Sequence, residues 1–146
     1  MLLVQHIRDH YDQVLLGLKK RNQVHADATL QQVLALDELR KSSQTQRDQL
    51  QAEANTISKE IGILMKEGKT VEATAVRDRS AVLKTQIKAL EEQNEQAEEE
   101  LKALLYTLPN VPHEAVPAGK SAEDNVVVFT HGEIPNLAKD KLPHWD

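Results

Sequence analysis

The chain has 146 residues, no cysteine and a formal net charge of −5 at pH 7; 28% of its residues are charged and only 3% are aromatic. This composition is typical of long helices and excludes an aromatic-rich globular core, and the lack of cysteine excludes disulfides and thiolate metal sites. The acidic balance excludes a generally cationic nucleic-acid binder, so any RNA binding would need a local basic patch. No apolar run approaches the roughly 18 residues of a membrane span and the start does not resemble a signal peptide, so we expect a cytoplasmic protein that does not contact membranes.

The first segment, residues 2–22, carries apolar residues at close to a helical period. They are Leu3, Ile7, Val14, Leu15 and Leu18, the spacing of one face of an amphipathic helix. The segment ends in the basic run Lys19-Lys20-Arg21, which suits the carboxyl end of a helix. We therefore expect one short amino-terminal helix.

Two long segments follow, and in each the core candidates recur in alternating steps of three and four, the pattern of a heptad seam. Gly68, between them, is a natural helix stop. The first seam consists of Val33, Leu36, Arg40, Ser43, Arg47, Leu50, Ala54, Ile57, Ile61 and Leu64. The second consists of Ala73, Val76, Ser80, Leu83, Ile87, Leu90, Asn94, Ala97, Leu101, Leu104 and Leu108.

The two seams match each other across the Gly68 turn. The residue numbers of facing positions add up to 137, so that Leu50 faces Ile87 and Ser43 faces Asn94 in a polar layer. One register for both seams predicts an all-α fold: a long antiparallel two-helix coiled-coil hairpin over about residues 30–108, with its turn near 66–70. A helical bundle with the same periodicity is the alternative.

The last segment begins at Pro109, where three prolines end the helix and force an extended path: Pro109, Pro112 and Pro117. Residues 125–130 read as a short strand, for which the chain offers no partner strand. The chain then ends at His144-Trp145-Asp146. This pattern predicts an extended carboxy-terminal tail and suggests a truncated chain.

Several short motifs in this order resemble bacterial seryl-tRNA synthetases. The hairpin carries Asn55-Thr56-Ile57-Ser58-Lys59-Glu60-Ile61-Gly62, similar to the Asn-x-x-Ser-Lys-x-Ile-Gly segment of that family. The segment that follows the hairpin carries Leu108-Pro109-Asn110-Val111-Pro112-His113, then Val116-Pro117-x-Gly119 and Asp124-Asn125-Val126. The amino-terminal segment carries Ile7-Arg8 and Lys20-Arg21. Ala54 stands where the family commonly has arginine, so we assign no RNA contact to that position.

The resemblance implies that residues 1–108 are the amino-terminal tRNA-binding arm, which grips the long variable arm of serine tRNA. Residues 109–146 would be a linker and the start of a truncated catalytic domain. In the family, that domain activates serine with ATP and magnesium and forms most of a homodimer interface. We therefore expect no enzymatic activity and no cofactor in this fragment.

Charge is distributed unevenly along the hairpin. Residues 54–90 hold seven basic and four acidic residues, a net charge of +3, whereas residues 91–100 hold six acidic residues and no basic one. The half of the hairpin next to the Gly68 turn, the distal half, is therefore cationic and is a candidate for phosphate contacts. An ordinary solvated helix face is the alternative explanation for such a run of charges.

The heptad positions, labelled a to g, predict on which side of the hairpin each of these charged residues lies. With Ile61 and Ala73 at a, the e edges of the two antiparallel helices share one side and the g edges share the other. The e side, with its outer surface and the turn, carries the RNA-binding candidates Asn55, Lys59, Gly62, Lys66, Lys69, Arg77, Lys84 and Lys88. The g side carries Glu53, Glu60, Glu67 and Glu72, and we expect Arg79, also at g, to pair with Glu60.

Other chemistry has little support in the sequence. His6 and His10 have a spacing that can bind metal, but no clear third ligand accompanies them, and we expect no metal site. We find no catalytic triad pattern, phosphate-binding loop or HExxH motif, and we assign no catalytic residue. The rival interpretation is a coiled-coil protein-interaction scaffold, which should show an exposed apolar stripe outside the seam; we find none of any length in the sequence.

Overall fold

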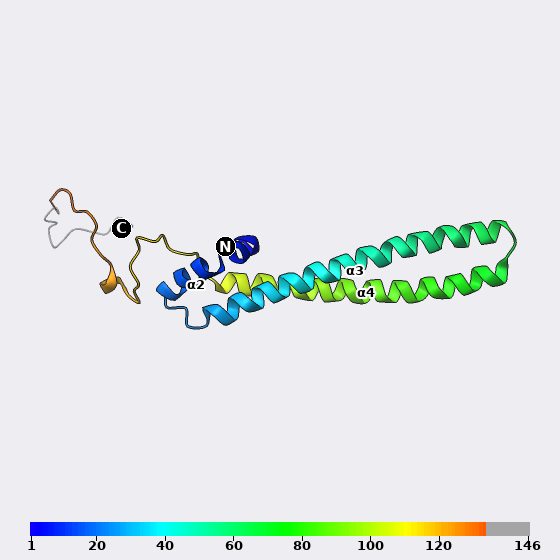
Figure 1. Cartoon of the computed structure of the whole chain (residues 1–146), viewed down its shortest axis with the longest axis horizontal. Coiled ribbons are helices and arrows are strands. Elements are labelled where there is room, and N and C mark those ends of the chain that lie inside the picture. The colour runs from blue at the N-terminus through cyan, green and yellow to red at the C-terminus, as the bar shows by residue number, and fades with distance from the viewer. Residues whose placement is uncertain (134–146) are drawn as a thin grey trace, which may run out of the picture.

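A computed structural model describes residues 1–133. Within that range the fold is helical and contains no strand, which confirms the predicted class. Two long helices lie side by side, and two short helices and the tail lie at one end of the pair (Figure 1). The elements are α1 (Val4–Asp9), α2 (Tyr11–Lys20), α3 (Ala26–Lys66), α4 (Thr70–Thr107) and the short 3₁₀ helix η1 (Ala122–Asp124).

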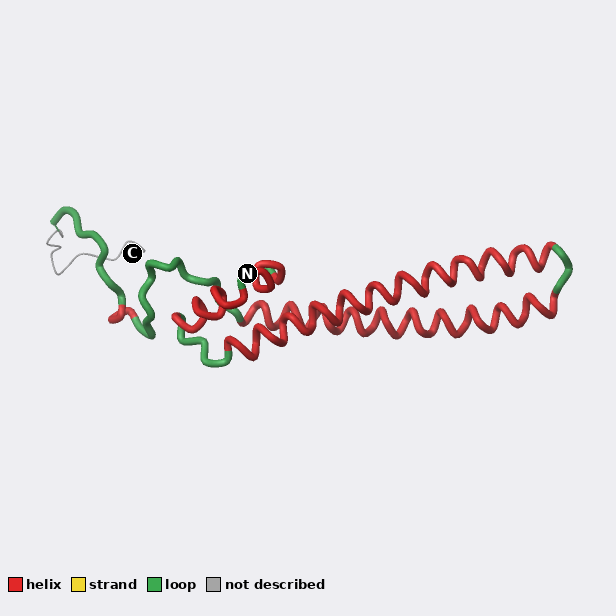
Figure 2. Tube along the Cα trace, viewed as in Figure 1, coloured by secondary structure: helices red, strands yellow, loops and turns green. Residues whose placement is uncertain are grey.

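Helices α3 and α4 form the predicted antiparallel hairpin, which extends away from the remaining elements (Figure 2). The chain reverses at Gly68, whose φ of 74° lies in the left-handed region that glycine adopts without steric cost. The backbone N–H of Lys69 donates to the Leu64 carbonyl at 3.0 Å, which closes the end of α3. We call this end of the hairpin the tip and the opposite end the base.

Every predicted seam position is buried or half-buried, as expected for two helices that face each other through one heptad register. The apolar residues gather in two clusters. The distal cluster contains Ala54, Ile57, Leu83 and Ile87, with Leu50, Ile61 and Val76 packed against it. The basal cluster contains Leu2, Ile7, Val14, Leu18, Ala26, Leu30, Val33, Leu101, Leu105 and Leu108.

A polar stretch of the seam separates the two clusters. Arg40 and Arg47 are half-buried there, and Ser43 is buried. The Ser43 hydroxyl donates to Oε1 of Gln93 at 3.2 Å, and Gln93 is the neighbour in sequence of Asn94, which faces Ser43 in the predicted register. The Asn94 amide donates to Glu98 at 3.4 Å, and its Oδ1 is buried and has no hydrogen-bond partner among residues 1–133. Unsatisfied polar atoms of this kind lower local stability.

The amino-terminal segment forms two helices instead of the single helix that we predicted. The break lies at His10, where φ is −130° and ψ is 39°. Leu3 precedes α1 in an extended conformation and is 70% exposed, whereas Leu2 is only 8% exposed. Consecutive side chains point to opposite sides of extended backbone, so Leu2 enters the basal cluster in place of Leu3.

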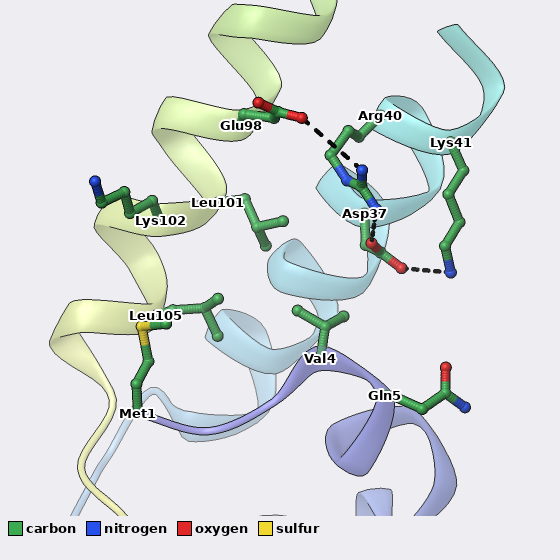
Figure 3. A pocket seen from close by; sticks show the side chains of 10 residues that line it. All are labelled: Met1, Val4, Gln5, Asp37, Arg40, Lys41, Glu98, Leu101, Lys102 and Leu105. Carbon is green, nitrogen blue, oxygen red and sulfur yellow. Dashed lines mark hydrogen bonds and ion pairs between the residues drawn. The ribbon is translucent and has the colours of Figure 1, made fainter. Parts of the chain in front are cut away.

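A buried carboxylate fastens α1 to the base of the hairpin. Asp37, only 4% exposed, accepts from Arg8 of α1 at 2.7 Å and from Lys41 and Arg40 of α3 at 2.8 and 3.3 Å. Figure 3 shows Asp37 with Arg40 and Lys41 of α3, together with the pair that Arg40 forms with Glu98 of α4 at 3.8 Å. Burial by itself raises the pKa of Asp37, but hydrogen bonds from Lys41, Arg8 and Arg40 outweigh it, so the pKa is lowered.

The first part of the tail is tied to α2. The Lys20 ammonium donates to the carbonyls of Glu114 and Val116 at 2.8 and 3.3 Å, and Arg21 donates to the carbonyl of Asn110 at 2.9 Å. The strand predicted at residues 125–130 is not formed in the described part of the chain; the backbone there is irregular and its large apolar side chains are exposed. The predicted tail also includes residues 134–146, which lie outside the described residues.

Candidate nucleic-acid interface

All eight predicted RNA-binding residues are exposed. Asn55, Lys59, Gly62 and Lys66 follow each other in steps of four, three and four along α3, and therefore form one stripe of that helix. Arg77, Lys84 and Lys88 form a corresponding stripe on α4, while Lys69 lies in the turn. The helix geometry thus produces two cationic stripes in the distal half of the hairpin.

Four of the cations lack an acidic partner in the part of the chain that the structure describes. Within residues 1–133, no carboxylate lies within 4.0 Å of Lys59, Lys66, Arg77 or Lys84, whereas Lys69 pairs with Glu67 at 2.8 Å and Lys88 with Glu92 at 3.8 Å. Unpaired ammonium and guanidinium groups on an exposed helix keep their full capacity to donate to phosphate oxygens. Asn55 accepts from Gln51 at 3.3 Å and keeps its amide donors.

One ion pair fixes which edges of the helices meet. Arg79 pairs with Glu53, not with Glu60 as we predicted. Both acids are at g and flank the position opposite Arg79, so the heptad pattern alone could not decide between them. The observed pair still brings two g positions together, and in an antiparallel pair the e positions Arg77 and Lys84 then lie on the other side.

We call the e side of the distal half, with its outer surface and the turn, the cationic face. It consists of the eight predicted residues. The sequence did not single out the short or uncharged residues between them, namely Ser58 and Met65 at e and Thr74 and Ala81 at b, all of which are exposed. The heptad pattern was the signal that could have identified them.

No contact or backbone conformation within the described residues requires glycine at position 62. A Cβ built on it would meet nothing within 4 Å, and its backbone is helical. Glycine there costs the helix about 1 kcal/mol relative to alanine. A close approach of a ligand backbone would account for a residue without a side chain at this point of the cationic face. Ala54, by contrast, is buried in the distal cluster and presents no side chain to a ligand.

Residues 1–133 contain neither a metal-binding cluster nor a membrane-spanning helix. The rings of His6 and His10 lie 4.9 Å apart, but within residues 1–133 no group of three or more His, Cys, Asp and Glu side chains is placed to hold a metal ion. None of the helices in the same range is long and apolar enough to cross a membrane. The groove in Figure 3, lined by Val4, Leu101 and Leu105 beside the Asp37 cluster, belongs to the packing of α1 on the base.

Fold and site together define the class of the protein, an antiparallel coiled-coil arm whose far half carries a cationic face. The family described as the seryl-tRNA synthetase N-terminal domain matches residues 1–112. The chain therefore belongs to the seryl-tRNA synthetase N-terminal domain family, which confirms the resemblance seen in the sequence.

Curated relatives agree with this assignment. A serine–tRNA ligase of Synechococcus sp. (strain JA-3-3Ab) is 38% identical over 99% of this chain and 33% of its own length. One of Solibacter usitatus (strain Ellin6076) is 44% identical over 76% of this chain and 26% of its own length. This chain thus spans about one third of the length of the first of these relatives.

A solved structure shares the fold. The seryl-tRNA synthetase from Pyrococcus horikoshii, crystallised in complex with ATP, matches with a TM-score of 0.77 and 30% sequence identity. The match covers 86% of this chain and 28% of that protein. The hairpin described above is therefore a shared architecture of this family.

Proposed function

We propose that this chain is the tRNA-binding arm of a serine–tRNA ligase, and that its cationic face docks the long variable arm of serine tRNA. The observation that carries the proposal is the difference in charge between the two sides of the distal half of the hairpin. Lys59, Lys66, Arg77 and Lys84 are exposed and without acidic partners within residues 1–133, whereas the opposite edge carries Glu53 and the exposed Glu60. A polyanion is attracted to the first side and repelled by the second.

The mode of recognition follows from the kind of contact. Lysine and arginine contacts to phosphates position an RNA without reading its bases, and RNA helices are recognised largely by shape. Helix α3 has 41 residues, or about 60 Å at 1.5 Å per residue. A rigid arm of this length selects a tRNA whose variable stem is long enough to reach the cationic face.

The activity of the whole protein is part of the same proposal. A catalytic domain beyond this chain would carry out ATP-dependent serylation, bind ATP and magnesium, and form a homodimer, and residues 109–146 would be the linker and the start of that domain. Both relatives described above are serine–tRNA ligases, which supports this assignment. The protein would act in the cytoplasm, where tRNA is charged.

The test is charge reversal on the cationic face. Changing Lys59, Lys66 and Lys84 to Glu should weaken binding of a tRNA with a long variable arm. It should also flatten the dependence of log K on log salt by about two units, because each lost phosphate contact removes somewhat less than one unit. Binding is measured at low salt, with a tRNA that has a short variable arm as the specificity reference.

The matched control makes the same change in net charge away from the face. Lys19, Lys102 and Lys120 are exposed at the base and in the tail, and reversing them to Glu should leave the salt slope nearly unchanged. Equal losses from both triple variants would mean that net charge alone governs binding. Unchanged binding in the first variant, with helicity intact, would remove the RNA site from this face and favour the scaffold interpretation.

A further inference from the structure

The carboxyl end of α2 holds the start of the tail at the base of the hairpin (Figure 1). Lys20 is half-buried there, and its ammonium donates to the carbonyls of Glu114 and Val116 at 2.8 and 3.3 Å. The carbonyl of Lys20 itself accepts from the backbone N–H of Gly119 at 3.4 Å. The side chain and the main chain of this lysine therefore bond to three points of one short stretch of the tail.

The end of α2 is closed by its own backbone, which gives Lys20 a defined position. Asn22 has a φ of 58°, and its N–H donates to the carbonyl of Lys19 at 2.9 Å. The N–H of Gln23 donates to the carbonyl of Leu18 at 3.1 Å. This is the pattern of a Schellman motif, which satisfies the carbonyls of the last helical turn. The carbonyl of Lys20 takes no part in the motif, so it can accept the amide of the tail.

A glycine allows the tail to approach α2 closely. Gly17 is buried in α2, and a Cβ built on it would overlap Cγ1 of Val111 and lie 3.4 Å from Cδ of Pro112. Val111 in turn packs against the basal cluster. Glycine is unfavourable inside a helix, so the contact with the tail gives this glycine a structural reason that Gly62 lacks within the described residues.

The stretch that α2 holds has little freedom of its own. Arg21 donates to the carbonyl of Asn110 at 2.9 Å, and three prolines restrict the backbone between residues 109 and 117. Helix α2 is itself packed on the base of the hairpin, where Val14 and Leu18 are fully buried. The position of the hairpin is thus transmitted through α2 to the tail. We call Gly17, Lys20 and Arg21 the tail clamp.

We propose that Lys20 is a positioning residue which, through the tail clamp, fixes the direction in which the chain leaves the arm. The inference rests on the proposed function, in which a catalytic domain follows the tail. An arm of about 60 Å acts as a lever, so a change of about 10° at its base moves its tip by about 10 Å. That angle must be held if one tRNA is to meet the cationic face and the catalytic domain together, since small errors of placement slow a reaction strongly.

The distance between two spin labels tests the clamp in the 146-residue chain. The chain has no cysteine, so Gln32→Cys on the hairpin and Ala118→Cys in the tail, both exposed positions, can be labelled specifically. The natural chain should give one narrow distance distribution. Lys20→Met removes the ammonium but keeps an apolar stem, and should broaden the distribution at least about twofold, because the freed stretch samples more conformations. Gly17→Ala should shift the mean distance, because the new methyl group displaces Val111.

Two further variants separate the clamp from a general effect of charge. Lys19→Met makes the same change at the neighbouring exposed lysine and should leave the distribution narrow. Lys20→Arg keeps several N–H donors on a long side chain and should also keep it narrow. Circular dichroism reports whether each variant remains helical. A broad distribution in the natural chain, or no difference between the natural chain and Lys20→Met, would overturn the proposal.

The same variant separates this inference from the proposed function. In the 146-residue chain, Lys20→Met should bind tRNA with unchanged affinity, because the cationic face is intact. In the full-length protein it should lower kcat/KM for serylation of tRNA at least about tenfold, while activation of serine with ATP is unchanged. Full serylation despite a broadened distribution would show that the clamp does not position the arm. If the natural full-length protein did not serylate tRNA, the proposed function would fail, whereas the spin-label distances would still decide whether Lys20 fixes the tail.

Discussion

Asp37 is a buried carboxylate whose cost of burial is offset by three cations, and its removal tests how firmly α1 is held. Asp37→Asn should lower the free energy of unfolding by about 2–3 kcal/mol, because a buried charged hydrogen-bond acceptor is lost while Arg8, Arg40 and Lys41 remain. Urea unfolding measures the loss. Asp48→Asn is the control: Asp48 pairs with Arg47 on the exposed surface, where such pairs contribute little to stability.

The same residue predicts a pH dependence. The pKa of Asp37 is lower in the folded protein than its ordinary value of 3.8. Its contribution to stability is therefore present above that value and is lost as the pH falls through the lower, folded-state pKa. The stability difference between the natural chain and Asp37→Asn should be constant near neutrality and shrink below about pH 4. A difference that stays constant as the pH falls below about 4 would mean that packing, not charge, fastens α1.

Gly62 offers a test in which stability and binding change in opposite directions. Gly62→Ala should raise the free energy of unfolding by about 1 kcal/mol, since the new Cβ meets open space. If an RNA backbone approaches Gly62, the same change should weaken tRNA binding. Thr56→Ala, at an exposed position on the opposite side, is the control and should leave binding unchanged. A stabilised Gly62→Ala variant with unchanged affinity would make this glycine a tolerated surface residue.

At the level of single residues, sequence reasoning succeeded where a periodic rule applies and failed where contacts cross helices. The heptad pattern correctly predicted that Lys59 and Lys84 are exposed and that Ser80 is buried. It could not choose between Glu53 and Glu60 as the partner of Arg79, because side-chain reach decides that pair. It also missed the Asp37 cluster, since Arg8 is separated from Asp37 by 29 positions and by the break at His10.

Among the elements, α3 and α4 were the most predictable, because each repeats one pattern over many turns and a single register satisfies both. The amino-terminal segment was less predictable. Its apolar spacing allowed one helix, and the break at His10 lets α1 and α2 each pack on the basal cluster. The strand expected at residues 125–130 is not formed in the described part of the chain, since a strand needs a partner to satisfy its backbone.

The hairpin register predicts a specific crosslink. Cysteines at Leu50 and Ile87, which face each other in the predicted register and both pack in the distal cluster, should form a disulfide within one chain under oxidation. The natural chain has no cysteine, so no background pairing occurs. Cysteines at Leu50 and Ser80 are the control: they are displaced by seven residues, or about 10 Å, and should not crosslink within a chain. Formation of covalent dimers alone would contradict the intramolecular register.

For the molecule as a whole, the polar stretch divides the hairpin into two regions of unequal stability. The basal cluster is supported by α1 and α2, whereas the distal cluster depends on α3 and α4 alone. Regions with fewer buried apolar contacts open at lower free energy. Amide hydrogen exchange should therefore show stronger protection around Leu30 and Leu101 than around Ile57 and Leu83. Residues 126–130 provide the unprotected reference, because no backbone hydrogen bond is formed there in the described part of the chain. Uniform protection along both helices would mean that the hairpin unfolds as one unit.

The antiparallel register also restricts how the length of the arm can change in evolution. A chain that loses seven residues from α3 alone shifts the rest of one seam by two turns against the other, so Leu50 and Ile87 no longer meet. Loss of one heptad from each helix, at facing positions, keeps every remaining pair and shortens the arm by about 10 Å. Insertions and deletions between relatives should therefore occur in matched pairs on either side of Gly68.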